Sequence, residues 1–108
     1  MLKTIRIGND GRIVGPDRQV RTTRRRDLGG PDQVQWIRVG ADGRPYTIFF
    51  RTDSPFRQGS GPQRIPVPPD SPSMVYTVDE AQPVKTYKYD VLDGNDGVLD
   101  DPDLIIDS

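Results

Sequence analysis

The carboxylate-rich segment at residues 93–103 is the part of the chain whose side chains best match a chemical task. Carboxylate and amide groups recur there between glycines, and the candidate ligands are Asp93, Asn95, Asp96, Asp100 and Asp101. Hard oxygen ligands of this kind suit Ca²⁺. The spacing differs from that of the twelve-residue calcium loop, since Gly97 stands fifth from Asp93 and no Glu stands twelfth. Asp-Gly and Asn-Asp-Gly also form turns, so a solvated turn is the alternative interpretation.

A run of arginines at residues 18–26 is the second chemically distinctive feature. Guanidinium groups donate bidentate hydrogen bonds to carboxylates and phosphates. No aromatic side chain interrupts the run to stack on bases, and the net charge of the chain is −1, which argues against a nucleic-acid interface. Protection of an exposed sheet edge or pairing within the fold is the ordinary interpretation of such a run, and a protein partner is the functional alternative. The partner-binding candidates are Arg21, Arg24, Arg25 and Arg26.

The chain contains no cysteine and no histidine. Thiol nucleophiles, imidazole bases, disulfides and zinc sites built on these ligands are therefore excluded. We expect a protein without enzymatic activity and without a bound cofactor.

Charge is divided unequally along the chain. Residues 1–54 carry eleven Lys and Arg against six Asp and Glu, whereas residues 55–108 carry four against ten. Two interpretations follow: the halves attract each other within one fold, or the arginine run of one copy docks on the acidic segment of another.

The elements that position these groups are short strands. Eleven Gly and eleven Pro among 108 residues disfavour helices, and turn sequences recur about every 8–12 residues. We expect one domain, with a hairpin and an edge strand in residues 1–30 and the core in residues 31–108. The hairpin spans residues 3–14, and the edge strand spans residues 18–26.

The core strands are expected from period-two alternation. Residues 33–39 and 46–51 are predicted to form a hairpin that buries Trp36, with the second run central in its sheet. The loop after it is anchored by Phe56. Further strands are predicted at residues 63–67 (an edge, because of its prolines), 71–78, 84–92 and 104–106. In the run at 84–92, the inward side chains are predicted to be Lys85, Tyr87, Tyr89 and Val91.

From residue 31 onward, the order of these pieces resembles a cupredoxin. The matching pieces are the Asp-x-Val-x-Trp motif at 31–36, the apolar strand at 46–50, the loop at 54–56, the Tyr-x-Tyr strand at 86–91 and the closing strand at 103–106. The resemblance covers about the last three-quarters of the chain. The predicted fold is an all-β, antiparallel β-sandwich, cupredoxin-like or immunoglobulin-like, with seven to eight short strands.

The copper ligands of that family are missing. The resemblance places the ligand cysteine at Val91 or Leu92, and the ligand histidines within residues 44–46 and 93–101. Blue copper requires imidazole and thiolate ligands, so electron transfer is not carried over. We expect a copper-free, non-enzymatic module for protein binding or assembly.

The competing hypothesis is a calcium-dependent ligand-binding or enzyme domain that uses the acidic segment. The expected partner is another protein or a second copy of the chain, with no nucleic acid and no membrane. No leader peptide or membrane-spanning run is visible in the sequence, which predicts a cytoplasmic location.

Overall fold

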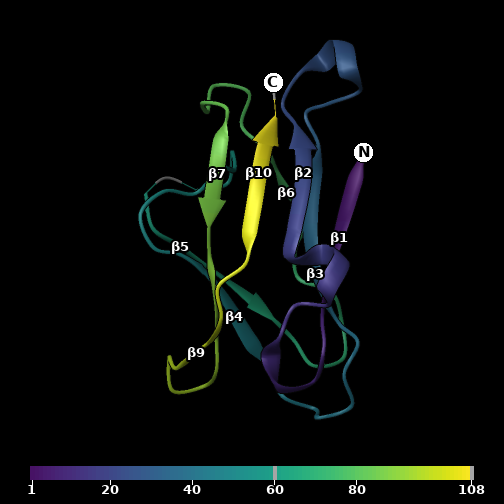
Figure 1. Ribbon diagram of the computed structural model, residues 1–108, viewed down its shortest axis with the longest axis vertical. Helices are drawn as coiled ribbons and strands as arrows, with labels where there is room; N and C mark the ends of the chain where they lie inside the picture. The colour runs from purple at the N-terminus through teal and green to yellow at the C-terminus, as the bar shows by residue number, and fades with distance from the viewer. Residues whose placement is uncertain (60, 108) are drawn as a thin grey trace.

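Short strands and short 3-10 helices make up the regular structure of the chain, which the computed structural model describes over residues 1–59 and 61–107 (Figure 1). The strands are β1 (Leu2–Ile7), β2 (Gln19–Thr23), β3 (Gln33–Arg38), β4 (Tyr46–Phe50), β5 (Gln63–Val67), β6 (Tyr76–Thr77), β7 (Lys85–Lys88), β8 (Asp90–Leu92), β9 (Val98–Asp100) and β10 (Asp103–Asp107). The 3-10 helices are η1 (Asn9–Gly11), η2 (Gly15–Arg18) and η3 (Arg26–Leu28). The predicted all-β class is confirmed, and the described residues form ten strands in place of seven to eight.

The strands are arranged in three sheets, with the orders β1-β3-β6, β2-β10-β7 and β5-β4-β8-β9. β1 runs parallel to β3, and β2 runs parallel to β10. The ladders β3–β6, β10–β7, β4–β5, β4–β8 and β8–β9 are antiparallel. Three predictions are confirmed by this order: β4 is central in its sheet, and β2 and β5 are edge strands of theirs.

One continuous stretch of chain joins two of the sheets at Tyr89. β7 belongs to the sheet with β2 and β10, whereas β8 belongs to the four-stranded sheet, and only Tyr89 separates them. Its N–H donates to the carbonyl of Pro102 at 3.2 Å, and its side chain is buried. A strand that changes sheet in this way makes a corner of a β-sandwich.

The core lies between the sheets and is centred on Trp36. Its ring centroid is 6.3 Å from that of Phe50, 6.2 Å from that of Phe56 and 5.6 Å from that of Tyr89, all in edge-to-face geometry. The indole N–H donates to the Tyr89 hydroxyl at 3.4 Å. The predicted burial of Trp36 and the anchoring role of Phe56 are confirmed, since both side chains have no exposed surface.

The predicted hairpin of residues 33–39 and 46–51 is wrong. β3 pairs with β1 and β6, whereas β4 pairs with β5 and β8, so the two strands lie in different sheets. The loop between β3 and β4 is hydrogen-bonded to η1, because the Ala41 N–H donates to the Asn9 side-chain oxygen at 2.9 Å. At Gly40, a Cβ atom would lie 2.8 Å from the Asn9 backbone nitrogen, so glycine permits this close approach.

Three other expected strands differ in extent. The N-terminal hairpin is reduced to a single antiparallel bridge between Ile7 and Ile13, because β1 takes β3 as its partner. The run at 71–78 forms a strand only over Tyr76–Thr77. The run at 84–92 is split by the change of sheet, and Lys85 is exposed, beyond the core, with its ammonium 3.7 Å from the Asp53 carboxylate. None of the helices in the described residues has the length and apolar character needed to span a membrane.

Candidate partner-binding site

The connection between β2 and β3 is closed at its base by two reciprocal hydrogen bonds. Asp32 donates its backbone N–H to the carbonyl of Thr23 at 2.8 Å, and its carboxylate accepts the Thr23 N–H at 2.9 Å. A Cβ atom at Gly30 would lie 2.8 Å from the Thr23 carbonyl oxygen, so this fold-back requires glycine. η3 lies within the closed loop and is capped at its C-terminal end by Gly29, whose φ is 84°. The loop therefore presents Arg26 from a fixed base.

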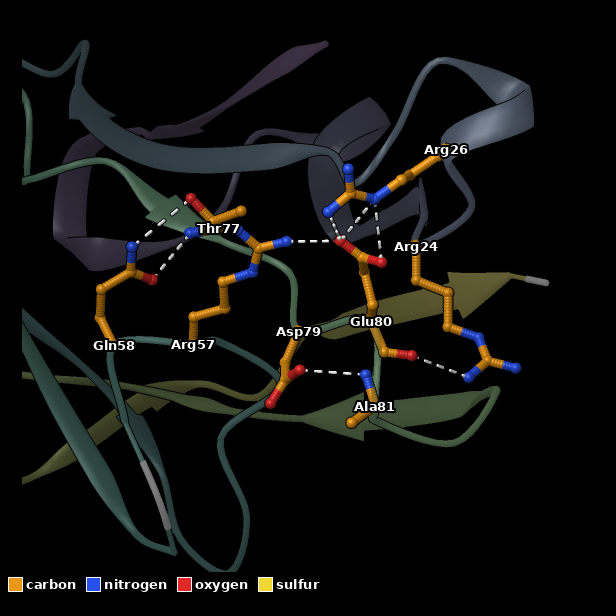
Figure 2. Close-up of polar contacts among 8 residues, drawn as sticks. All are labelled: Arg24, Arg26, Arg57, Gln58, Thr77, Asp79, Glu80 and Ala81. Carbon is orange, nitrogen blue, oxygen red and sulfur yellow. Dashed lines mark hydrogen bonds and ion pairs between the residues drawn. The ribbon is translucent and has the colours of Figure 1, made fainter.

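Arg26 and Arg57 meet on one carboxylate, that of Glu80 (Figure 2). The Arg26 Nε lies 3.2 Å from both carboxylate oxygens, and its Nη2 lies 3.0 Å from Oε1. Arg57 donates from Nη2 to the same Oε1 at 2.6 Å. The side chains of Arg26 and Arg57 are 78% and 45% exposed, against 36% for Glu80. We call the two guanidiniums the arginine clamp.

The base of Arg57 is tied to β6. Its backbone N–H donates to the carbonyl of Thr77 at 2.9 Å, and Phe56 forms an antiparallel bridge with Val78. Next to it, the Gln58 side-chain oxygen accepts the Thr77 N–H at 2.9 Å (Figure 2). Arg57 therefore extends from backbone that is held on both sides of the residue, although it belongs to a loop between strands.

Glu80 lies in a turn that is held by contacts other than its own carboxylate. The Gln82 N–H donates to the carbonyl of Asp79 at 3.1 Å, and the Ala81 N–H donates to the Asp79 carboxylate at 3.0 Å. Arg24 donates from Nη1 to the carbonyl of Glu80 at 3.2 Å (Figure 2). It also donates to the carbonyl of Gln82 at 2.8 Å. Arg24 thus binds the backbone of the turn, whereas the arginine clamp binds the Glu80 side chain.

The arginine clamp favours the ionised form of the Glu80 carboxylate. The hydrogen bond from Arg26 lowers the pKa of Glu80 from its ordinary value, against an opposing effect of partial burial, and the charges of Arg26 and Arg57 lower it further. The same hydrogen bond raises the pKa of Arg26. Two positive charges face one negative charge here, so the clamp keeps a local excess of positive charge at neutral pH.

The other arginines of the predicted set point elsewhere. Arg21, on β2, pairs with Asp107 of β10 at 3.1 Å. Arg25 pairs with Asp27 within its own loop. The structure therefore does not gather the four candidates on one surface: two of them reach the Glu80 turn and two do not, and the full set is Arg21, Arg24, Arg25 and Arg26.

A hollow of about 390 Å³ is lined in part by the β2–β3 connection. Leu28, which is exposed, and the side chains of Lys3 and Arg21 contribute to its wall. The connection thus contributes Arg26 to the arginine clamp and Leu28 to this hollow. The complete lining is Met1, Lys3, Arg21, Thr22, Thr23, Leu28, Gly29, Asp32 and Asp107.

The first part of the acidic segment forms a hydrogen-bonded turn. The Asp93 carboxylate accepts the backbone N–H groups of Asn95 and Gly97, both at 2.8 Å. These bonds lower the pKa of Asp93. Asp96 turns away from this site and pairs with Arg64 of β5 at 3.0 Å.

The second part of the segment is bound to the N-terminal half of the chain. Asp100 pairs with Arg18 at 2.5 Å and accepts the N–H of Ile13 at 2.9 Å. Asp101 is exposed. The predicted calcium ligands are thus spread over separate contacts. Within residues 1–59 and 61–107, no group of three or more His, Cys, Asp or Glu side chains is placed to hold a metal ion.

A second hollow, of about 310 Å³, brings together the two segments at which the resemblance placed copper ligands. Arg44, Pro45 and Tyr46 line one side, and the turn from Asp93 to Asn95 lines the other. Their donor set consists of guanidinium, phenol, carboxylate and amide groups, which does not fit blue copper.

Beside this hollow, the Arg38 side chain is almost fully buried. It pairs with Asp42 at 2.5 Å and lies over the Tyr46 ring, 4.4 Å from its centroid. The Tyr46 hydroxyl donates to Asp42 at 2.7 Å. Hydrogen bonds from Tyr46, then Arg38, then the Arg44 N–H hold the pKa of Asp42 far below its usual range. These contacts tie β3 to the start of β4.

Comparison with known proteins finds no matching family model and no matching curated protein sequence.

Sequence reasoning missed the two residues that complete the cluster, Arg57 and Glu80. Arg57 lies in the predicted loop that Phe56 anchors, and Glu80 lies between the predicted strands at 71–78 and 84–92. However, 23 residues separate Arg57 from Glu80, and 54 residues separate Arg26 from Glu80. The only sequence signal for the contact is the unequal division of charge, since Arg26 belongs to the basic half and Glu80 to the acidic half.

Proposed function

We propose that this chain is a non-enzymatic binding or assembly module that recognises an acidic segment of a partner protein through Arg26 and Arg57. The observation that carries the proposal is the convergence of two exposed guanidiniums on a single carboxylate. Guanidinium groups are the side chains best suited to binding carboxylates with defined geometry. The backbones that carry both arginines are fixed, so little conformational entropy is lost on binding.

We also propose a cupredoxin-like architecture without copper. Support comes from the matching motifs, which fall on β3, β4, β7–β8 and β10 in the expected order. Further support is the meeting of residues 44–46 with the turn at 93–95, because the resemblance places the ligand histidines in these two segments.

A test uses a fluorescein-labelled, glutamate-rich peptide as the probe and a glutamine-rich peptide of equal length as its control. The wild-type protein is expected to bind only the acidic probe. Binding should weaken as salt rises from about 0.1 M to about 1 M, because the Debye length falls from about 10 Å to about 3 Å. Fluorescence anisotropy measures both effects.

Charge reversal localises the binding. The double variant Arg26→Glu with Arg57→Glu is expected to bind the probe at least tenfold more weakly, since one lost hydrogen bond to a charged group costs about 1.5 kcal/mol. The matched control is Arg12→Glu with Arg64→Glu, which changes the total charge equally at exposed positions away from the clamp. Equal losses in the two double variants would assign the binding to overall charge and contradict the proposal.

We propose a different protein as the partner rather than a second copy of this chain. The acidic segment that a second copy would offer already has Asp96 and Asp100 in ion pairs within its own fold. Sedimentation at about 20 mM and about 500 mM salt is expected to give a monomer at both concentrations. Association at the lower concentration only would favour docking between copies instead.

A further inference from the structure

We infer that Glu80 occupies the arginine clamp as an internal stand-in for a carboxylate of the partner, and that binding requires this carboxylate to displace it. The inference rests on the proposed function. It adds a regulatory contact to that site, because the Glu80 carboxylate competes with the partner for the same two guanidiniums. The ligand class is the side-chain carboxylate of an acidic protein segment.

Release of the Glu80 carboxylate leaves its turn intact. Asp79 accepts the N–H of Ala81, and Arg24 donates to the carbonyl of Glu80 (Figure 2). Asp79 also accepts the N–H of Gln82, and Arg24 also donates to the Gln82 carbonyl. None of these contacts involves the Glu80 carboxylate. The exchange therefore requires only rotation of one partly exposed side chain, which is a rapid motion in proteins.

The backbone segments that carry Arg26 and Arg57 stay in place when the Glu80 carboxylate leaves. Arg57 is fixed through Thr77, and Arg26 extends from the loop that Thr23 and Asp32 close. The two guanidiniums approach Glu80 from different segments, the loop between β4 and β5 and the β2–β3 connection (Figure 2). Without Glu80 they would repel each other across the gap, so an incoming carboxylate is favoured at this point.

The competition sets the observed affinity. A partner binds only those molecules in which the Glu80 carboxylate has left the arginine clamp. Its observed affinity is therefore the intrinsic affinity multiplied by the fraction of such molecules. An exposed ion pair of this kind reduces the affinity of a competing carboxylate by up to about fivefold. Removing the Glu80 charge is therefore expected to strengthen binding of an acidic segment about fivefold.

The experiment compares Glu80→Gln with Asp79→Asn, using the glutamate-rich peptide as the probe and the full 108-residue chain. Both variants remove one negative charge from the same turn, but only Glu80 contacts the guanidiniums. Asparagine at position 79 can still accept the Ala81 N–H. We expect about fivefold tighter binding for Glu80→Gln and less than about a twofold change for Asp79→Asn. Equal changes in the two variants would overturn the displacement and leave the proposed function standing.

A second readout follows the Glu80 carboxyl carbon by ¹³C NMR during a pH titration. When the peptide saturates the site, the pKa of Glu80 is expected to rise towards its ordinary value, because the guanidiniums no longer contact it. A pKa that stays unchanged while the peptide binds would overturn the inference. Absence of peptide binding in the wild-type chain and in Glu80→Gln alike would overturn the proposed function, and the inference with it.

Discussion

At the scale of single residues, the side chains that carry the fold and those that form the candidate site differ in how far they could be predicted. Trp36 lies in an alternating apolar run, so its burial follows from local sequence. Glu80 lies in a turn, where an exposed charge is the ordinary expectation, and its contact with Arg26 spans 54 residues. Local patterns contain no information about such a contact, because it depends on how the strands are ordered.

Replacement of Trp36 by alanine is expected to lower the free energy of unfolding by about 3–5 kcal/mol, the usual cost of truncating a large buried aromatic side chain. The indole is fully buried and makes edge-to-face contacts with three other rings. Urea unfolding followed by circular dichroism measures the change. A loss below about 1 kcal/mol would mean that the surrounding rings close the cavity, contrary to the packing described.

At the scale of elements, alternation predicts strands but not their partners. The run at 84–92 alternates without interruption, yet it contributes to two sheets because the chain crosses between them at Tyr89. The parallel pairing of β1 with β3 and of β2 with β10 joins segments that are distant in sequence. No turn sequence between the paired strands predicts either pairing. The edge position of β5 was predicted correctly, because Pro66 cannot donate a backbone hydrogen bond.

Proline substitution separates central from edge strands. β10 has partners on both sides, so the Ile105 N–H is part of a ladder. Ile105→Pro is therefore expected to lower the free energy of unfolding by about 1–3 kcal/mol or more, because the acceptor of that N–H is left without a donor. In β5, Arg64 and Pro66 share the same direction of the backbone N–H, since they are two residues apart. Arg64→Pro should therefore leave the ladder with β4 intact. Urea unfolding of both variants tests this, and equal losses would contradict the assigned sheet order.

At the scale of the whole molecule, ion pairs join the two oppositely charged halves. Arg18 with Asp100, Arg21 with Asp107 and Arg26 with Glu80 each connect the basic N-terminal half to the acidic C-terminal half. This is the first of the two interpretations that the charge division allowed. At the arginine clamp a second cation is added to this pattern, because Arg57 of the acidic half shares Glu80 with Arg26.

The absence of histidine and cysteine also determines how the stability of the whole chain depends on pH. Between about pH 5 and about pH 9, no side chain of ordinary pKa titrates. The free energy of unfolding is therefore expected to stay constant over this range. Urea unfolding at a series of pH values measures it. A change of more than about 1 kcal/mol centred between pH 6 and 8 would contradict the expectation.

Both limits of this range follow from the signs of the pKa shifts. Asp42, Asp93 and Glu80 have a lower pKa in the folded state, so their stabilisation is present above about pH 4 and is lost as the pH falls further. Burial raises the pKa of Tyr89 in the folded state. Its unfolded form therefore loses the proton first, and stability falls as the pH rises above about 10.

Tyr89→Phe isolates the alkaline limit. At neutral pH this variant is expected to lose about 1–3 kcal/mol, because the Trp36 indole N–H loses its acceptor. Above about pH 10, its free energy of unfolding should fall less steeply than that of the wild-type chain, since the buried hydroxyl that resists ionisation has been removed. The two stability curves should therefore converge as the pH rises. Parallel curves would show that other groups set the alkaline limit and that the Tyr89 hydroxyl is not the one held neutral by the core.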